Sequence, residues 1–361
     1  MQTSYVNYLG FGLLSLILVL LIGYQWVVIE QIDNDDPRFT AANLGVVVNE
    51  GDRLSIEIAD YYQTQRHIPQ QNIITVRFNP DQTELSTTDF KALQRQVERQ
   101  VSPNIQGFLL TWAAPYRVDC MSITSAFALG FDPKYCAQGC LPTAPNPYFN
   151  YPSSRPYHDY QVRPTMLLAA TNFAEAKALI DRGLAAEGTN PKGTAYLLST
   201  GDRARNSRAT TFATIQQIFG KRFRVEVLQA DTLTDKTDVM FYFTGLPKVD
   251  KLETLTFRPG AIADHLTSFG GKLTGKSGQM SSLRWLEAGA TGSYGTVVEP
   301  CNFPQKFPDI SIILDRYLNG ATLLESYWQS VLWPGQGVFI GDPLARPFPN
   351  GDQIDDKITA Q

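Results

Sequence analysis

Three residue types that together can perform acyl transfer lie close to one another in the C-terminal third of the chain. Asp264 directly precedes His265, and Ser268 follows three positions later. A hydroxyl nucleophile needs an imidazole to take its proton and a carboxylate to orient that imidazole, so these types suggest a hydrolase. Spacing alone does not fix the geometry, because Leu266 stands where the first glycine of a G-x-S-x-G motif belongs. The alternative is that His265 is a hydrogen-bonded structural histidine.

Cys301 offers a second route to covalent chemistry, a thiolate nucleophile with His265 as its base. A disulfide or a small buried thiol is the alternative use of this cysteine. The other cysteines, Cys120, Cys136 and Cys140, lie close together. Four cysteines allow three complete pairings, and the simplest expectation in an oxidising compartment is a disulfide within this group of three. Their spacing matches no strong zinc motif, so we expect no metal and no cofactor.

The segment Gly270 to Ser277 matches the phosphate-binding string G-x-x-x-x-G-K-S. A working phosphate loop follows a buried strand and opens a helix directly. Here the preceding residues, Asp264 to Ser268, are polar, and Gly278 delays the helix. We therefore expect a flexible glycine-rich loop at this position and not a nucleotide site.

These candidate residues must be positioned by a fold in which apolar, β-rich runs alternate with amphipathic helical stretches. Such alternation is typical of an α/β fold with a mostly parallel sheet and helices on both faces. The expected strands are Leu44–Asn49, Ile73–Phe78, Gly107–Trp112, Thr165–Ala170, Thr194–Ser199, Arg224–Leu228, Val239–Phe243 and Ala290–Val298. Besides a helix that ends near Arg66, the expected helices are at 89–100, 173–186, 207–219, 279–288, 310–318 and 322–330.

Polar residues follow several of the expected strands. In an open α/β sheet, ligands bind in the crevice beyond the carboxyl ends of the strands. We therefore expect a ligand crevice at that edge of the sheet. Its predicted lining residues are Thr244, Gly245, Thr267, Glu299 and Asn302.

Residues 113–163 interrupt the alternation. This segment is rich in Pro, Tyr, Asn and Cys and shows no sustained periodicity. An irregular segment of this length inside a compact domain is uncommon and is often functional. We expect it to be an insertion that serves as a lid or partner surface. The domain that contains it is predicted to span residues 43–348, followed by a tail at 349–361.

An uncharged apolar stretch at residues 9–29 lies between a short tail at 1–8 and a linker at 30–42. At 1.5 Å per residue, it is long enough to cross roughly 30 Å of hydrocarbon. A cleaved signal peptide is the alternative. However, no Lys or Arg precedes the stretch, and Tyr24, Gln25 and Trp26 stand where a cleavage site belongs. We expect a single-pass signal anchor that places the bulk of the chain outside the cytoplasm.

The charge pattern bears on the class of partner. The formal net charge is −4 at pH 7, and charges of both signs are interspersed. A nucleic-acid-binding surface needs a basic run or stripe that can track phosphates. The sequence has no such run, so we expect no nucleic-acid partner.

Motifs spread over most of the part after the linker carry a resemblance. They are Leu44–Asn49, Ser55–Tyr62, Arg66–Pro69, Pro259–Phe269, Gly295–Pro300 and Gly341–Phe348. As a set they resemble an uncharacterised family of exported bacterial proteins. Members of that family occur in genomes that encode exosortase, a membrane sorting enzyme. The resemblance implies a protein of the bacterial membrane with its main domain in the periplasm, and it implies no particular activity.

A second resemblance concerns the order of elements around Tyr242–Gly245, Gly289 and Gly341–Pro343. This order is similar to gingipain-type cysteine peptidases, and it implies a caspase-like or Rossmann-like three-layer fold. Those peptidases place a catalytic histidine directly after Thr-Gly and a catalytic cysteine at the end of the next strand. Leu246 stands at the first position, and 261–264 contain no cysteine. The resemblance therefore implies a pseudoenzyme, a peptidase fold without the peptidase's catalytic groups.

Two functions follow from these observations. The first is a membrane-anchored, non-catalytic binding or assembly factor in envelope export or surface sorting, which holds a peptide, glycan or protein. The alternative is a peptidase-like hydrolase that uses Asp264, His265 and Ser268 or Cys301. The imidazole of His265 discriminates between them. A ring that reaches a hydroxyl, thiol or carboxylate in an open cleft favours the hydrolase, and a ring buried against backbone carbonyl groups disfavours it.

Overall fold

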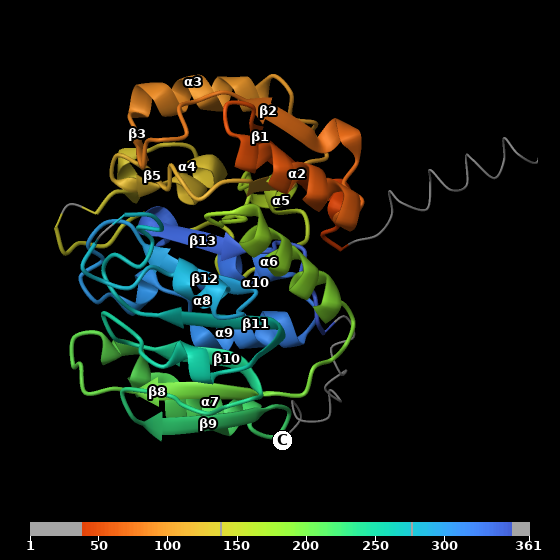
Figure 1. The fold of residues 1–361 in the computed structure, drawn as a ribbon. Helices are drawn as coiled ribbons and strands as arrows, with labels where there is room; N and C mark the ends of the chain where they lie inside the picture. The colour runs from red at the N-terminus through yellow and green to blue at the C-terminus, as the bar shows by residue number, and fades with distance from the viewer. Residues whose placement is uncertain (1–37, 138, 276, 349–361) are drawn as a thin grey trace, which may run out of the picture. The chain divides into compact units, whose positions relative to one another are not determined.

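The computed structural model describes residues 38–137, 139–275 and 277–348 (Figure 1). The predicted membrane anchor at 9–29 and the predicted tail at 349–361 lie outside these residues. Within the described part of the chain, every helix is too short or too polar to cross a bilayer. A compact unit begins at Phe39, whose side chain is buried.

One large sheet runs through this unit (Figure 1). Its ten strands lie in the order β2-β1-β4-β7-β13-β12-β11-β10-β8-β9. Strands β1, β2, β4 and β7 are parallel to one another, and so are β8 to β12. Strand β13 is antiparallel to β12 and meets β7 through Ile340 and Leu167. The bounds are β1 (Leu44–Asn49), β2 (Ile73–Val76), β4 (Gly107–Leu110), β7 (Thr165–Leu167), β8 (Thr194–Ser199), β9 (Arg224–Gln229), β10 (Val239–Thr244), β11 (Phe257–His265), β12 (Gly292–Thr296) and β13 (Gly337–Gly341).

The two ends of the sheet repeat one strand order. In each half, the second strand along the chain lies at the outer edge of the sheet, next to the first, and the later strands follow toward the centre. The two orders, from the outer edge, are β2-β1-β4-β7 and β9-β8-β10-β11. The halves meet at β13, so the segments that follow β4 and β11 come together. The Tyr116 hydroxyl donates a hydrogen bond of 3.4 Å to the Thr274 carbonyl oxygen. The 113–163 insertion therefore lies beside the loops of the second half.

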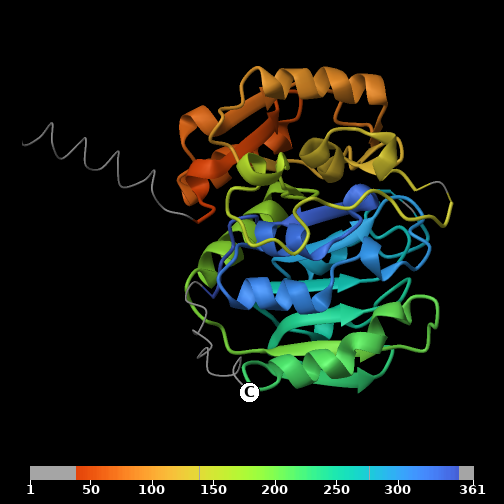
Figure 2. The same cartoon turned by 180° about the vertical axis from the view of Figure 1, so that it is seen from behind.

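Helices cover both faces of the sheet. Tyr242 packs edge-to-face on Trp285 at 5.0 Å, whereas its neighbour Phe241 packs on Tyr317 at 6.2 Å, so the two faces have different helices. One face carries α2 (Arg53–Arg66), α6 (Phe173–Ala186) and α8 (Leu283–Glu287), as seen in Figure 1. The other carries α7 (Phe212–Phe219), α9 (Ile310–Leu318) and α10 (Leu323–Ser330), as seen in Figure 2. The predicted α/β fold with a mostly parallel sheet flanked by helices is confirmed.

Most predicted elements lie where the sequence places them. The bounds of β1, β8, α6 and α9 agree with the prediction residue for residue. The predicted helix at 207–219 begins as a 3-10 turn, Asn206–Thr211, before α7. The helix predicted at 279–288 is confined to α8, because the Gln279 side chain accepts hydrogen bonds from Thr267 and Phe269 within the preceding loop. Strand β13 was not predicted, since a five-residue run has little periodicity of its own.

The 113–163 insertion contains short elements that periodicity does not reveal. Strands β5 (Arg117–Val118) and β6 (Met121–Ser122) pair with β3 (Glu84–Leu85) in a second, three-stranded sheet. Two helices in it, α4 (Ile123–Leu129) and α5 (Pro156–Tyr160), flank a long irregular stretch, and α3 (Thr87–Glu98) lies on the outer side of the first half (Figure 2). The Ser122 and Ser125 hydroxyls donate to the carbonyl oxygens of Gly337 and Pro334, at 2.5 and 2.6 Å. The insertion is therefore bonded to the centre of the main sheet.

Candidate functional site

Asp264 and His265 are consecutive residues of β11 and therefore point to opposite faces of the sheet. On the face covered by α9, the Asp264 Oδ1 atom accepts a 2.5 Å hydrogen bond from Arg208 Nη2. On the other face, His265 packs against Trp285 of α8. The predicted carboxylate and imidazole are thus kept apart by the pleat of the strand. The structure does not bring them together as a catalytic pair.

Both ring nitrogens of His265 already have partners. Trp285 Nε1 donates to Nδ1 at 2.9 Å, which leaves Nε2 to donate to the Met280 carbonyl oxygen at 3.1 Å. Burial of the ring lowers its pKa to about 4, so the imidazole is neutral at pH 7. No nitrogen is left to take a proton from Ser268. A buried ring held by a backbone carbonyl is the arrangement that disfavours the hydrolase.

Cys301 is part of a disulfide and carries no free thiol. Its partner is Cys140, and Cys120 pairs with Cys136. One disulfide thus lies within the group of three, and the other leaves Cys301 without the free thiol that the predicted thiolate role needs. The Cys140–Cys301 bond joins the insertion to the turn after β12.

The predicted crevice at the ends of β10 and β11 is filled by its own polar groups. Thr244 and Thr267 are buried, at 2% and 1% exposure. Thr267 Oγ accepts a hydrogen bond from Arg205 Nε at 3.2 Å and donates to Gln279 Oε1 at 2.8 Å. A Cβ atom on Gly245 would lie 2.0 Å from the Arg205 carbonyl oxygen, so the backbone is in contact there. These residues lie beneath the surface and not on an open cleft.

Glu299 and Asn302 lie apart from those residues, in an exposed turn after β12. The Glu299 carboxylate accepts a 2.9 Å hydrogen bond from the Cys301 backbone N–H. Cys301 and Asn302 both adopt the left-handed conformation, with φ of 56° and 58°. The predicted crevice residues are therefore divided between a buried layer and a turn that faces the insertion.

The glycine-rich string at 270–277 also has a structural use. A Cβ atom on Gly271 would lie 2.5 Å from the Gly295 carbonyl oxygen, so this glycine permits close packing of the loop on β12. Helix α8 begins only at Leu283, well after the string. The loop does not open a helix, as a phosphate-binding loop must.

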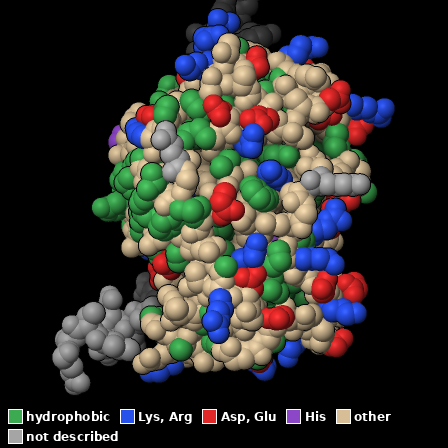
Figure 3. All heavy atoms as spheres, turned by 90° about the vertical axis from the view of Figure 1, so that its left-hand side faces the viewer, with side chains coloured by type: hydrophobic (Ala, Val, Ile, Leu, Met, Phe, Trp, Pro, Cys, Tyr) green, Lys and Arg blue, Asp and Glu red, His purple; other side chains and the backbone are tan. Residues whose placement is uncertain are grey.

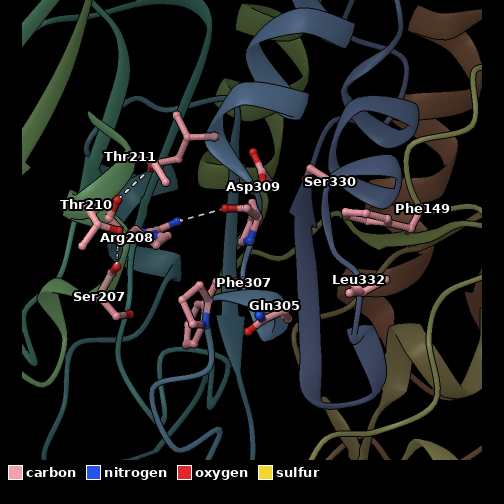
Figure 4. Close-up of a pocket in the computed structure, with 13 residues that line it drawn as sticks. Phe149, Ser207, Arg208, Thr210, Thr211, Gln305, Phe307, Asp309, Ser330 and Leu332 are labelled. Carbon is pink, nitrogen blue, oxygen red and sulfur yellow. Dashed lines mark hydrogen bonds between the residues drawn. The ribbon is translucent and has the colours of Figure 1, made fainter. Parts of the chain in front are cut away.

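An open pocket lies instead on the α9 and α10 face, next to the insertion (Figure 4). We call it the insertion-side pocket, and its volume is about 170 Å³. Figure 4 shows Phe149 of the insertion on one side and the turn that precedes α7 on the other. The lining residues are Phe149, Ser207, Arg208, Thr210, Thr211, Pro304, Gln305, Phe307, Pro308, Asp309, Ile310, Ser330 and Leu332.

Exposed apolar side chains flank the pocket residue Phe149 in the sequence of the insertion. Leu141 and Tyr151, both in the insertion, are 55% and 57% exposed, which is high for large hydrophobic side chains. The intervening stretch adds the exposed prolines Pro142, Pro145 and Pro147. Figure 3 shows hydrophobic side chains gathered on one side of the face that it presents. Exposed hydrophobic side chains that gather on one face mark an interaction site more often than a solvated loop.

The floor of the pocket carries a buried charge pair. The guanidinium of Arg208 donates to Asp264 and, at 3.0 Å, to the Thr244 carbonyl oxygen. It also lies between the rings of Phe243 and Phe307, at 5.7 and 5.9 Å. Burial raises the pKa of the Asp264 carboxyl, although the Arg208 charge acts in the opposite direction. Removal of either charge would leave the other buried without a partner.

The rim of the pocket is fixed in place by backbone and side-chain hydrogen bonds. Asn146 Nδ2 donates to the Trp328 carbonyl oxygen and Asn146 N to the Leu332 carbonyl oxygen, both at 2.7 Å. The Asn150 N–H donates to the Gln329 carbonyl oxygen at 2.9 Å. Together with the Cys140–Cys301 disulfide, these bonds preorganise the exposed apolar surface. A rigid surface loses less conformational entropy when it binds a partner.

Sequence reasoning identified the insertion but missed the pocket residues Arg208 and Phe307. Arg208 lies in a polar stretch that reads as the start of a surface helix, and nothing in its neighbours indicates burial. Phe307 lies between prolines in a segment without periodicity. Only the composition of 113–163, rich in prolines and tyrosines, pointed to this part of the surface.

Comparison with known proteins adds no relative. No family model matches the chain, and neither a curated protein nor a solved structure matches it.

Proposed function

We propose that this chain is a non-catalytic binding protein that holds an extended peptide across the insertion-side pocket. The observation that carries the proposal is the open pocket that the insertion lines through Phe149, together with the exposed Leu141 and Tyr151 of the same insertion. The state of the predicted catalytic groups also supports a non-catalytic function. His265 is bonded through both nitrogens, and Cys301 is held in a disulfide.

The pocket has the size of one large side chain. Its volume of about 170 Å³ is close to that of an apolar cavity of roughly 150 Å³ that accommodates benzene. Phe149, Phe307 and Leu332 provide apolar walls, and the hydroxyls of Ser207 and Thr211 lie at the margin. A peptide that inserts a phenylalanine or leucine there would gain the burial energy of a typical anchor residue. The prolines and Tyr151 on the rim would contact the residues that flank the anchor.

The two disulfides support a location in an oxidising compartment, as proposed from the apolar stretch at residues 9–29. We place the domain on the periplasmic side of a bacterial membrane, where peptide segments of exported proteins pass. The resemblance to an exosortase-associated family extends the proposal to envelope export or surface sorting. Labelling of intact cells with a thiol-reactive polyethylene glycol tests this location. The four cysteines should react only after reduction, and reaction without a reductant would contradict it.

A peptide series tests the binding function. The probes are acetylated pentapeptides of sequence Gly-Pro-X-Pro-Gly, with X as Phe, Leu, Ala or Asp, titrated against the full chain by fluorescence anisotropy. We expect affinity to fall in the order Phe, Leu, Ala, with at least a tenfold difference between Phe and Ala. The reason is that burial of a large apolar side chain contributes about 2 kcal/mol to the free energy of binding. Equal binding of the four peptides, or none, would overturn the proposal.

A pocket-filling variant supplies the control. Thr211 lines the pocket and is exposed at its margin, so Thr211→Trp should block the pocket without disturbing the core. Thr64→Trp, at an exposed position of α2, is the matched control. We expect loss of the preference for Phe in the first variant only. Retention of that preference in Thr211→Trp would place the binding elsewhere.

Activity probes test the absence of catalysis. Fluorophosphonate and vinyl sulfone reagents label activated serine and cysteine nucleophiles, respectively. We expect the folded chain to remain unlabelled, because no base is available to activate Ser268. Labelling at Ser268 that disappears in His265→Ala would restore the hydrolase.

A further inference from the structure

A second hollow lies at the edge of the sheet opposite to the predicted crevice. In Figure 1 this edge is at the ends of β8 and β9 that lie away from their arrowheads. The hollow is open, and its volume is about 890 Å³, far larger than the insertion-side pocket. We call it the basic groove, because four of its lining side chains are cationic and one is acidic: Lys192, Arg222, Arg224, Arg258 and Asp238.

Strand pairing places these residues in one row. The neighbouring strands along the sheet are β11, β10, β8 and β9. Arg258 is the second residue of β11, Asp238 precedes β10, and Lys192 lies two residues before β8. Arg224, the first residue of β9, is paired with Thr194, the first residue of β8. Since adjacent strands lie about 4.8 Å apart, the strands that carry the cations span roughly 14 Å.

Gly193 brings two of the cations together. A Cβ atom on this glycine would lie 2.8 Å from the Asp238 carbonyl oxygen and 3.4 Å from Arg258 Cγ. The stem of Arg258 therefore lies against the residue that follows Lys192. Both cations are exposed, and within the described residues neither has a hydrogen bond or an ion pair. They are available to an anionic ligand.

The other charged groups leave the groove positive. Arg224 is paired with Glu226 at 2.5 Å. Arg222 donates hydrogen bonds to two neutral oxygens at the end of α9, which do not compensate its charge. The Asp238 carboxylate accepts hydrogen bonds from two hydroxyls of β8, at 2.6 and 2.8 Å. Four lining cations against Asp238 and Glu226 leave a net charge of +2.

The uncharged lining indicates the class of anion. The Asn190 side chain is exposed, and within the described part of the chain its amide has no hydrogen-bond partner. An amide can both donate to and accept from a hydroxyl, whereas a carboxylate only accepts. The partly exposed ring of Phe223 packs edge-to-face on Phe348 at 6.2 Å and adds apolar surface to the same wall. Ligand sites combine such surface with a few polar groups that fix orientation. These groups match a ligand that carries carboxylates, hydroxyls and apolar ring faces.

We propose that the basic groove binds an acidic oligosaccharide, whose carboxylates pair with Lys192 and Arg258 and whose hydroxyls bond to Asn190. The planar guanidinium of Arg258 can hold a carboxylate through two parallel hydrogen bonds. Carboxylates that repeat along the oligosaccharide reach the cations of several strands, which a single small anion cannot do. The groove and the insertion-side pocket share no lining residue, so this inference does not depend on the peptide-binding function.

Two oligosaccharides that differ only in charge test the inference in the full chain. The probes are hexagalacturonate and its fully methyl-esterified form. They are titrated by isothermal calorimetry at an ionic strength of about 0.01 M, where charges interact over roughly 30 Å. Loss of one charge-assisted hydrogen bond weakens binding about tenfold or more. We therefore expect the acid to bind at least tenfold more tightly than the ester. Equal affinity, or no binding of either probe, would overturn the inference.

An acidic peptide separates a sugar ligand from a peptide ligand. Hexaglutamate with acetylated and amidated ends carries as many carboxylates as hexagalacturonate, but it has no hydroxyls to pair with Asn190. One neutral hydrogen bond changes affinity about fivefold, so we expect hexaglutamate to bind about fivefold more weakly. Equal or tighter binding of hexaglutamate would assign the groove to an acidic peptide and overturn the inference.

Charge reversal in the groove is the control. K192E/R258E should abolish binding of hexagalacturonate, whereas K91E/R95E, on the exposed side of α3, should leave it unchanged. Both pairs of substitutions change the net charge equally, so a general electrostatic effect would act on both. All four side chains are exposed, and thermal unfolding should confirm that each variant folds. Binding that survives K192E/R258E, or an equal loss in both variants, would overturn the inference.

Discussion

The crevice at the ends of β10 and β11 and the insertion-side pocket lie on the same molecule but differ in how their side chains are satisfied. In the crevice, Arg205, Thr267 and Gln279 bond to one another and leave no room for a ligand. In the insertion, which lines the pocket through Phe149, Leu141 and Tyr151 remain exposed to water. The polar side chains of the crevice are hydrogen-bonded within the chain, whereas the exposed hydrophobic side chains of the insertion have no packing that covers them within the described part of the chain. A binding site is therefore expected at the second, even though the first has the residue types of a catalyst.

The largest expected effect concerns the charge pair beneath the pocket. Arg208→Met leaves the Asp264 carboxylate buried without a partner, and loss of one member of a buried pair costs about 3 to 5 kcal/mol. Urea unfolding at pH 7 measures this change. Arg53→Met is the matched control, because the Arg53 side chain is 91% exposed and its pairing with Glu57 contributes at most about 1 kcal/mol. Similar losses in both variants would show that the pair does not support the pocket floor.

The second prediction concerns His265 in the closed region. Its pKa is about 4 in the folded chain, against roughly 6.5 when unfolded, so the unfolded state binds more protons between these values. Stability should therefore fall as the pH drops from 7 to 4, by about 3 kcal/mol from this residue. His265→Gln keeps a donor and an acceptor but does not titrate. Urea unfolding across this range should show a weaker pH dependence in the variant, and identical profiles would contradict a buried neutral imidazole.

The two disulfides provide the third prediction. Cys140–Cys301 closes a separation of 161 residues and Cys120–Cys136 one of 16. In the chain-entropy model, the longer loop stabilises the fold by about 2 kcal/mol more. Thermal unfolding of C140S/C301S and C120S/C136S measures the difference. Because Cys140 also fixes the rim of the pocket, C140S/C301S should lose more affinity for the Phe pentapeptide. The reverse order in either assay would show that this disulfide does not hold the rim.

The smallest expected effect separates one exposed hydrophobic residue from another. Tyr151 and Ile218 are 57% and 60% exposed, but Tyr151 lies two residues after the pocket residue Phe149, whereas Ile218 lies on α7. Tyr151→Ala should weaken binding of the Phe pentapeptide about fivefold, a loss of roughly 1 kcal/mol that is common for rim contacts. Ile218→Ala should leave the affinity unchanged. Equal effects of the two substitutions would argue against a defined binding surface.

The sequence predicts the layers of this fold well because the sheet is built from local patterns. A run such as Leu44–Asn49 is apolar on both sides and reads directly as a buried strand. Strand β13 escapes prediction because its five residues take their strand conformation from pairing with β12. Non-local pairing leaves no signal in a short segment.

The candidate site was harder to predict because chemistry depends on side-chain direction. Asp264 and His265 are adjacent in sequence, yet the pleat of β11 directs them to opposite faces, and this follows once the segment is known to be a strand. The partner of Cys301 could not be chosen from three possible pairings. Lys192, Arg222 and Arg258 come from separate segments of the chain, yet they line one hollow at the edge of the sheet where β8 and β9 begin. A sequence without any basic run can therefore still present a cationic surface.

Hydrogen exchange of the full chain, with and without the Phe pentapeptide at saturating concentration, compares the two regions in one measurement. A bound ligand suppresses local opening of the backbone, so the amide hydrogens beneath it exchange more slowly with solvent. The account predicts slower exchange in residues 141–152 and 301–308, with no change in residues 244–246 and 265–275. Slower exchange confined to the second pair of segments would contradict it and return the binding site to the crevice.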